Sequence, residues 1–220
     1  MTGSAGVVFD VDGTLVDTNY LHVVAWWHAF RSAGHDIEMV RFHQTIGQGG
    51  ERFVETILGH RDQAITDAHT DYYSPYLHQL VAFPAAADLL RAVKKRGLKV
   101  ALATSASKKQ AEHLTAALDA DDVIDAVTTK DDAEESKPDP DIVQAALDRA
   151  GLDPQRSVFV GDTVWDVEAA GRAGLECICL RTGGVAEEQL RDAGAIAVYR
   201  DARHLLDGID DSPIGRFTHA

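Results

Sequence analysis

Short apolar runs recur along the chain, separated by longer segments in which apolar residues return every three or four positions. An uninterrupted apolar run predicts a strand buried on both faces, because a strand with one wet face alternates apolar and polar residues. These runs lie at residues 7–9, 99–104, 123–128, 157–160, 176–180 and 195–199, and helical patterns at 88–95, 108–118, 140–150 and from 162 to 173. Strands that alternate with helices of about a dozen residues indicate an α/β fold with a parallel, doubly wound sheet.

Residues 17–83 interrupt this alternation with a long stretch that contains no strand pattern. Helical spacing predicts helices at 20–30, 51–58 and 63–80, the last of them broken by Pro75. Pro84 halts the helical run and suits a hinge. We therefore expect a small all-helical domain at 17–83, inserted into a Rossmann-like core formed by 1–16 and 84–220. The polar segment from 207 to 220 is expected to be loosely ordered.

Charge and composition narrow the possible partners. The 220 residues carry a formal net charge of −14, with a pI near 5.0, which argues against nucleic acid or an anionic membrane as a partner. The chain shows no signal peptide and no apolar run of membrane-spanning length. Cys177 and Cys179 fit small core residues in a reducing compartment, so we expect a soluble, cytoplasmic protein that is either a monomer or a homodimer.

The first strand ends in the sequence D-V-D-G-T, which spans Asp10 to Thr14. If strand geometry persists, the side chains of Asp10 and Asp12 leave on the same side. Two carboxylates so close together normally require a divalent cation or a shared proton. Gly13 permits a sharp turn beside them, and Thr14 adds a hydroxyl. This segment is therefore the expected centre of the chemistry.

Three further sets of polar residues follow predicted strands. They are Thr104 with Ser105, then Lys137, and finally Asp162 with Asp166. Taken singly, each set has an ordinary explanation as a helix cap, a solvated loop cation or a complement to a helix dipole. However, ligands of doubly wound sheets bind beyond the carboxyl ends of the strands, where all of these residues are expected to lie. Together they favour one site over several unrelated features.

The segment D-V-D-G-T-L-V-D-T resembles the first signature of the haloacid dehalogenase superfamily, and the three later sets resemble its other signatures in the same order. The helical insert is similar to the small cap of the branch that contains phosphoglycolate phosphatases and β-phosphoglucomutases. The resemblance implies a Mg²⁺-dependent phosphatase that hydrolyses a small-molecule phosphate monoester through an aspartyl-phosphate intermediate.

The resemblance also implies a role for each residue. Asp10 would be the nucleophile, Asp12 the general acid and base, and Lys137 the cation that holds Asp10 and the phosphoryl oxygens together. The metal site would comprise Asp10, Asp12 through its backbone carbonyl, Asp162 and Asp166, the last anchoring a metal-bound water or orienting Lys137. The expected substrate and phosphate ligands are Gly13, Thr104 and Ser105 in the core, with His22, Gly47 and Arg52 in the cap.

Other branches of the superfamily fit less well. The metal-free dehalogenases lack the second aspartate of the first signature, which is present here as Asp12. The phosphonate-cleaving branch needs a cap lysine, and the first lysine of this chain is Lys94. A sugar-phosphate mutase stays open, because His22 matches a histidine of that branch. However, the cap loop has Gly47 where a mutase is expected to have an arginine, for which Arg52 would have to compensate, so hydrolysis is favoured.

A different class of protein uses similar chemistry. Phosphoacceptor receiver domains also gather acidic residues, a hydroxyl and a lysine around Mg²⁺. They are shorter, have no inserted helical module and accept phosphate later in the chain than the first strand. The insert at 17–83 therefore decides against a receiver domain, and the presence of all four motifs argues against a scaffold without catalysis.

Overall fold

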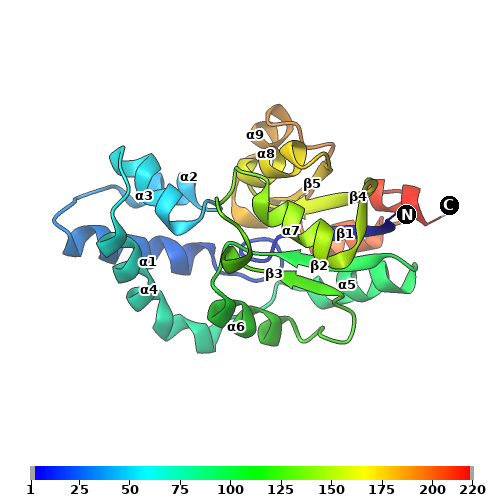
Figure 1. The fold of residues 1–220 in the computed structure, drawn as a ribbon, viewed down its shortest axis with the longest axis horizontal. Coiled ribbons are helices and arrows are strands. Elements are labelled where there is room, and N and C mark those ends of the chain that lie inside the picture. The colour runs from blue at the N-terminus through cyan, green and yellow to red at the C-terminus, as the bar shows by residue number, and fades with distance from the viewer. Residues whose placement is uncertain (1–2, 219–220) are drawn as a thin grey trace.

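The computed structural model describes residues 3–218 and contains one six-stranded parallel sheet (Figure 1). The strand order is β3-β2-β1-β4-β5-β6. The strands are β1 (Ser4–Phe9), β2 (Lys99–Ala103), β3 (Ala126–Thr128), β4 (Leu152–Gly161), β5 (Glu176–Leu180) and β6 (Ala197–Tyr199). The order reverses at β1, which lies between β2 and β4. The predicted doubly wound α/β sheet is confirmed.

Helices cover both faces of the sheet, which explains why the strands are apolar without alternation. Val7 and Phe9 pack on one face, while Val8, between them, packs on the other. The first face is covered by α5 (Ala86–Lys95), α6 (Lys108–Leu118) and α10 (Ala202–Asp207), and the second by α7 (Asp141–Ala150), α8 (Val164–Arg172) and α9 (Glu187–Asp192). Two buried apolar layers therefore fix the strands from both sides.

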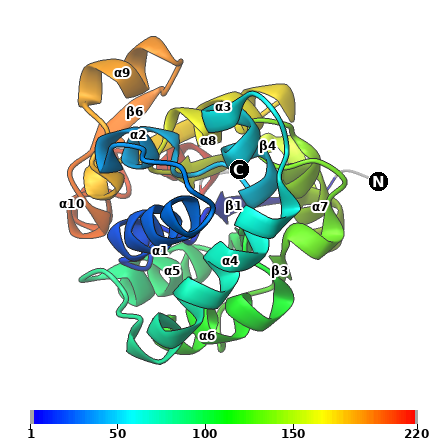
Figure 2. The ribbon, with the colours of Figure 1, turned by 90° about the vertical axis from the view of Figure 1, so that its left-hand side faces the viewer.

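The residues between β1 and α5 form a separate helical layer at the carboxyl end of the sheet (Figure 2). It consists of α1 (Asn19–Ser32), α2 (Met39–Thr45), α3 (Gly50–Leu58), α4 (Gln63–Tyr73) and a 3₁₀ helix (Ser74–Gln79). Trp26, Phe30, Phe42 and Phe53 form a buried aromatic core within this layer. As expected, regular α-helix stops before Pro75. The helix α2 was not predicted, because its seven residues are too few to show a period.

Two neighbouring connections join the helical layer to the sheet. Asp17 N donates to Val81 O at 3.0 Å, and Phe83 N donates to Leu15 O at 2.8 Å. The chain therefore leaves and re-enters the core through a hydrogen-bonded pair of antiparallel segments. The predicted domain boundaries at 17 and 83 fall on this pair and stay a prediction.

The expectation of loose order after residue 207 is wrong for residues 207–218; residues 219–220 lie outside the described part. Ile209 and Ile214 are buried in the same apolar cluster as α10, and the Ser212 hydroxyl caps the 3₁₀ helix Pro213–Phe217. Isolated apolar residues in short turns give no periodic pattern, which also explains why α9 and α10 were not predicted. Among the described residues, no helix is long and apolar enough to cross a membrane.

The C-terminal packing can be tested with Ile214→Ala. Ile214 is fully buried, so we expect the free energy of unfolding to fall by about 2–5 kcal/mol. Urea denaturation followed by circular dichroism measures the change. Ile196→Ala serves as the control, because Ile196 is 39% exposed and its truncation should change stability by about 0.5 kcal/mol or less. Equal effects of the two substitutions would contradict the structural role of the C-terminal segment.

Candidate active site

Three neighbouring strands bring the predicted core residues together at their carboxyl ends. Asp10 follows β1, Thr104 follows β2, and Asp162 follows β4. These strands lie side by side and run parallel, so residues distant in sequence meet at one edge of the sheet. This edge lies where the strand order reverses, the usual ligand position in doubly wound sheets.

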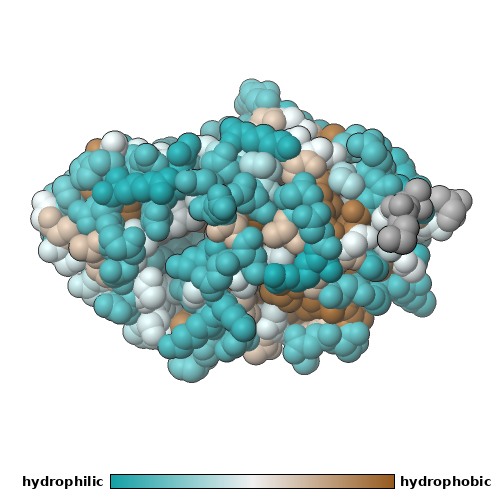
Figure 3. All heavy atoms as spheres, viewed as in Figure 1, coloured by the Kyte–Doolittle hydropathy of each residue, from teal (hydrophilic) through white to brown (hydrophobic). Residues whose placement is uncertain are grey.

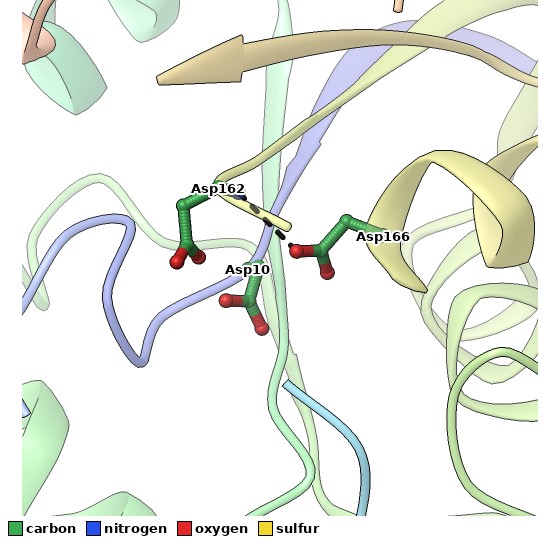
Figure 4. A group of neighbouring side chains, drawn as sticks. All are labelled: Asp10, Asp162 and Asp166. Carbon is green, nitrogen blue, oxygen red and sulfur yellow. Dashed lines mark hydrogen bonds between the residues drawn. The ribbon is translucent and has the colours of Figure 1, made fainter. Parts of the chain in front are cut away.

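Asp10, Asp162 and Asp166 form an aspartate triad at this edge (Figure 4). All three are buried, and one carboxylate oxygen from each lies within 4.8 Å of the others. Thr14 Oγ1 donates to Asp162 Oδ1 at 2.7 Å and lies 3.2 Å from Asp10 Oδ2. Asn19 Nδ2 donates to Asp162 Oδ2 at 3.2 Å. The triad is therefore held by neutral donors from the loop after β1 and the start of α1.

Lys137 is the cation of the triad. Its side chain is buried, and Nζ lies 2.5 Å from Asp10 Oδ1 and 2.7 Å from Asp166 Oδ1. The second oxygen of Asp166 accepts from the backbone N–H groups of Asp162 and Thr163 and from the Thr163 hydroxyl. Both oxygens of Asp166 are thus engaged in contacts within the protein. Of the two roles expected for Asp166, this arrangement favours the orientation of Lys137.

Burial and mutual repulsion dominate the electrostatics. Burial raises the pKa of Asp10 to about 7; Lys137 opposes this shift, while Asp166 and Asp12 add to it. Burial, together with the charges of Asp166 and Asp10, raises the pKa of Asp162 well above its usual value. Burial lowers the pKa of Lys137, but the neighbouring Asp10 and Asp166 raise it overall, so the lysine stays charged. One lysine therefore faces three buried carboxylates.

The donor set of the triad fits a divalent cation. Carboxylate oxygens of Asp10 and Asp162 are the hard ligands that such ions prefer. Asn19 Oδ1 is also buried and has no hydrogen-bond partner among the described residues. A buried, unpaired amide oxygen is costly unless it accepts a hydrogen bond, which a metal-bound water would provide. A divalent ion would also relieve the excess negative charge.

Asp12 turns away from the triad toward the helical layer. Its Oδ2 accepts from Thr104 Oγ1 at 2.8 Å, and its Oδ1 lies 3.4 Å from His22 Nε2. The same-side geometry expected for Asp10 and Asp12 required strand conformation through Asp12, but β1 ends at Phe9. Burial raises the pKa of Asp12, but hydrogen bonds and charge from His22, with help from Thr104, lower it overall. Asp12 is thus placed as a carboxylate that can accept a proton.

A second histidine, which the sequence analysis did not identify, fixes His22. His69 Nε2 lies 3.1 Å from His22 Nδ1, and the His69 ring stacks on Trp26 at 3.8 Å between centroids. Tyr73 stacks on His22 at 3.9 Å. Burial lowers the pKa of His69 well below its usual value, so this ring is neutral. His22 is therefore held toward Asp12 by an aromatic stack from α1 and α4.

Two glycines allow the loops to approach the triad. Gly13 has φ +78°, and a Cβ there would lie 2.5 Å from Asp162 Oδ2. A Cβ on Gly183, after β5, would lie 1.9 Å from the same oxygen. Gly13 thus serves close packing around Asp162. Neither Gly183 nor Asn19 carried a signal in the sequence, because both act through contacts with residues more than 20 positions away.

A cleft of about 360 Å³ opens between the sheet edge and the helical layer. Six of the predicted site residues line it, namely Asp10, Asp12, His22, Gly47, Arg52 and Ser105. The Ser105 hydroxyl is buried without a partner among the described residues, so it is free to bond a ligand. The remaining predicted residues, Gly13, Thr104, Lys137, Asp162 and Asp166, do not line the cleft and lie around the triad and Asp12. The geometry thus provides one site, with buried carboxylates at the bottom of the cleft and polar residues of the helical layer above them.

A parallel doubly wound sheet that places buried aspartates and a lysine beneath a helical cap defines a capped α/β enzyme, and solved structures share this arrangement. A hydrolase from Pseudomonas syringae superposes with a TM-score of 0.88 at 33% identity, covering 94% of this chain and 98% of that one. A variant of CbbY from Rhodobacter sphaeroides in complex with xylulose 1,5-bisphosphate gives 0.76 at 29% identity, covering 92% and 96%.

Sequence comparison gives the same family. The model of the haloacid dehalogenase-like hydrolases matches residues 5–174. Protein CbbY from Cereibacter sphaeroides is 31% identical (78% of this chain, 82% of the relative), and phosphoglycolate phosphatase from Pseudomonas putida is 29% identical (95% and 81%). The chain also matches 20% of the length of SUPPRESSOR OF QUENCHING 1 from Arabidopsis thaliana, at 30% identity over 90% of this chain. The chain belongs to the haloacid dehalogenase-like hydrolases, as its motifs indicated.

The packing around Asp162 can be tested with Gly183→Ala. The added methyl would collide with the Asp162 carboxylate, so we expect addition of a divalent cation such as Mg²⁺ to raise the Tm of the variant much less than that of the unchanged protein. Differential scanning fluorimetry with and without the cation measures this shift. Gly171→Ala is the matched control, because a Cβ there meets nothing within 4 Å. A full cation-dependent shift in Gly183→Ala would contradict metal binding at the triad.

Proposed function

We propose that the chain is a Mg²⁺-dependent phosphatase that hydrolyses a small-molecule phosphate monoester through an aspartyl-phosphate intermediate. The observation that carries the proposal is the buried contact of Asp10 with Lys137 at the base of a capped cleft, with Asp12 at the same cleft. Family membership and the names of the relatives, which include phosphatases, support the same conclusion.

The two halves of the reaction require different residues. In the first half, an Asp10 carboxylate oxygen forms a bond to phosphorus while the bond to the leaving oxygen breaks, and a protonated Asp12 supplies the proton to that oxygen. In the second half, Asp12 takes a proton from water as the water oxygen attacks phosphorus. The bond between the Asp10 oxygen and phosphorus breaks as inorganic phosphate is released, which restores the Asp10 carboxylate and the Asp12 proton. Lys137 favours the charged form of the free Asp10 carboxylate and orients it toward the cleft.

Mg²⁺ is the cation that the proposal assigns to the triad. Asp10, Asp162 and the backbone carbonyl of Asp12 would hold it, and Asp166 would position Lys137 beside it. When bound, the ion neutralises charge on the phosphoryl oxygens. Ser105 would position the phosphate, because its buried hydroxyl has no partner among the described residues and lies just after β2. Thr104 would act through Asp12, since its hydroxyl donates to that carboxylate.

The size of the cleft bears on the kind of substrate that it can hold. A cleft of about 360 Å³ suits a small ester, and the relatives that this chain resembles include a phosphoglycolate phosphatase and a protein bound to xylulose 1,5-bisphosphate.

Cys177 and Cys179 are buried free thiols with Sγ atoms 3.9 Å apart. Free thiols support a reducing, cytoplasmic environment.

One observation favours a second candidate, a sugar-phosphate mutase. His22, which matches a histidine of that branch, lies 3.4 Å from Asp12. In a mutase the phosphoryl group returns to a sugar hydroxyl in place of water, which requires cap cations that hold the second end of the substrate. Gly47 provides none, and Arg52 is paired with Glu55 at 3.4 Å. Hydrolysis therefore stays the favoured function.

Phosphate release from a panel of small monoesters tests the proposal. We expect release to require Mg²⁺ and to fall by about 10⁴-fold or more in Asp10→Asn, since the amide cannot act as the nucleophile. Asp17→Asn is the control, an exposed aspartate of the same segment. Chelator should abolish release in the unchanged protein.

Three results would contradict the phosphatase proposal. The first is release that persists in Asp10→Asn, and the second is the absence of release from every ester in a folded, Mg²⁺-loaded protein. The third is conversion of one sugar phosphate into its isomer without release, which would establish the mutase instead.

A further inference from the structure

Two arginines on the cap side of the cleft form ion pairs with carboxylates of the chain. Arg61 lies between α3 and α4, and its guanidinium is 3.1 Å from Glu51, 3.6 Å from Glu55 and 3.1 Å from Glu135. Arg52 lies 3.4 Å from Glu55. Both arginines that line the cleft are therefore already paired with carboxylates of the chain itself, with which an anion of the substrate would have to compete.

The ion pair between Arg61 and Glu135 crosses the cleft from cap to core. Glu135 belongs to the loop before Lys137, and the neighbouring Ser136 packs directly against Gly49 of the cap loop, where a Cβ would lie 2.4 Å from the serine Cβ. A second anionic group of a substrate that bound Arg61 would have to displace Glu135 in this tightly packed region.

The other charged residues that line the cleft leave its wall with more carboxylates than cations. Lys130 has no carboxylate within 4.0 Å among residues 3–218, and it is the third cation of the cleft wall. Apart from Asp10 and Asp12, the wall carries four carboxylates against these three cations, namely Glu51, Asp131, Glu134 and Glu135. Hydrophilic residues also dominate the face of the molecule shown in Figure 3, including the boundary between cap and core.

The other polar groups of the wall are neutral. They are the amides of Gln48, Gln63 and Gln110 and the hydroxyls of Thr66, Thr70 and Ser136. Amides and hydroxyls can both donate and accept hydrogen bonds, which suits the hydroxyls of a polyol or sugar. Each of these amides is hydrogen-bonded within the chain through one polar atom only, since Gln48 and Gln110 accept through Oε1 and Gln63 donates through Nε2. The second polar atom of each amide can therefore bond a hydroxyl of the substrate, whereas Lys130 is the one cation of the wall without a carboxylate partner among residues 3–218.

We propose that this cleft selects phosphate monoesters whose leaving group is uncharged and rich in hydroxyls, and discriminates against esters that carry a second phosphate or a carboxylate. This inference rests on the phosphatase function proposed above. The discrimination comes from repulsion by Glu51, Glu134 and Glu135 and from the prior engagement of Arg61, which is specificity through a repulsive element. The chain would then differ from relatives named for phosphoglycolate or bound to a bisphosphate.

Matched substrate pairs test the selectivity. The pairs are 2-hydroxyethyl phosphate with phosphoglycolate, and fructose 6-phosphate with fructose 1,6-bisphosphate. We expect kcat/KM, measured by phosphate release with saturating Mg²⁺, to be about tenfold or more higher for the member without the second anion, because like charges brought together in a cleft are strongly unfavourable. A higher kcat/KM for the anionic member of both pairs would overturn the selectivity while leaving the phosphatase function intact.

The double variant Glu51→Gln/Glu135→Gln tests the cause. It removes two carboxylates and leaves Glu55 as the one carboxylate beside Arg61 among the described residues. We therefore expect the ratio of kcat/KM within each pair to shift severalfold toward the anionic member, with the Tm little changed. Glu168→Gln/Glu187→Gln is the matched control, since each of these glutamates pairs with an arginine on its own helix and neither lines the cleft. An unchanged ratio in the first double variant would overturn the proposal. Hydrolysis of neither member of any pair would instead overturn the phosphatase function on which it rests.

Discussion

The structure depends most on the burial of three carboxylates around one lysine. Removing a carboxylate from water costs several kcal/mol after relaxation, and burying one partner of an ion pair alone costs about 3–5 kcal/mol. Lys137 touches two members of the triad, and Thr14 and Asn19 donate to the third, Asp162. Even so, one lysine does not balance three carboxylates, and burial together with their mutual repulsion raises the pKa values of Asp10 and Asp162. The site therefore has an excess of negative charge, which a bound cation, alone or together with a phosphoryl group, can relieve.

The sheet holds this unfavourable cluster in place. Two apolar layers fix β1 and β4 on both faces, so the backbone that carries Asp10 and Asp162 cannot move apart to relieve the repulsion. Asp166 is fixed in turn, since the N–H groups of Asp162 and Thr163 bind one of its oxygens. The stable core thus holds the repelling carboxylates close together at the edge of the sheet, a common arrangement at catalytic sites.

The sequence was informative wherever residue type and place in a regular element coincide. The strands, the helical insert and the residues at the strand ends could be predicted, because buried parallel strands are apolar throughout and their carboxyl ends meet. Other parts depend on contacts that no local pattern records. His69 reaches His22 across 47 positions, and Gly183 matters only because the Asp162 carboxylate lies against it. The ordered C-terminal segment was missed for the same reason, since Ile214 is buried by distant residues.

Two contacts across the boundary between cap and core link recognition to chemistry. On one side, His22 of the cap lies against Asp12, for which we propose the proton-transfer role. On the other side, Arg61 of the cap pairs with Glu135 of the core loop that leads to Lys137. Both contacts join the same two layers, and all four residues line the same cleft, so a bound ligand lies close to both of them. An anion that pairs with Arg61 would therefore compete with Glu135 at this boundary, whereas an uncharged group can lie beside the ion pair and leave it intact.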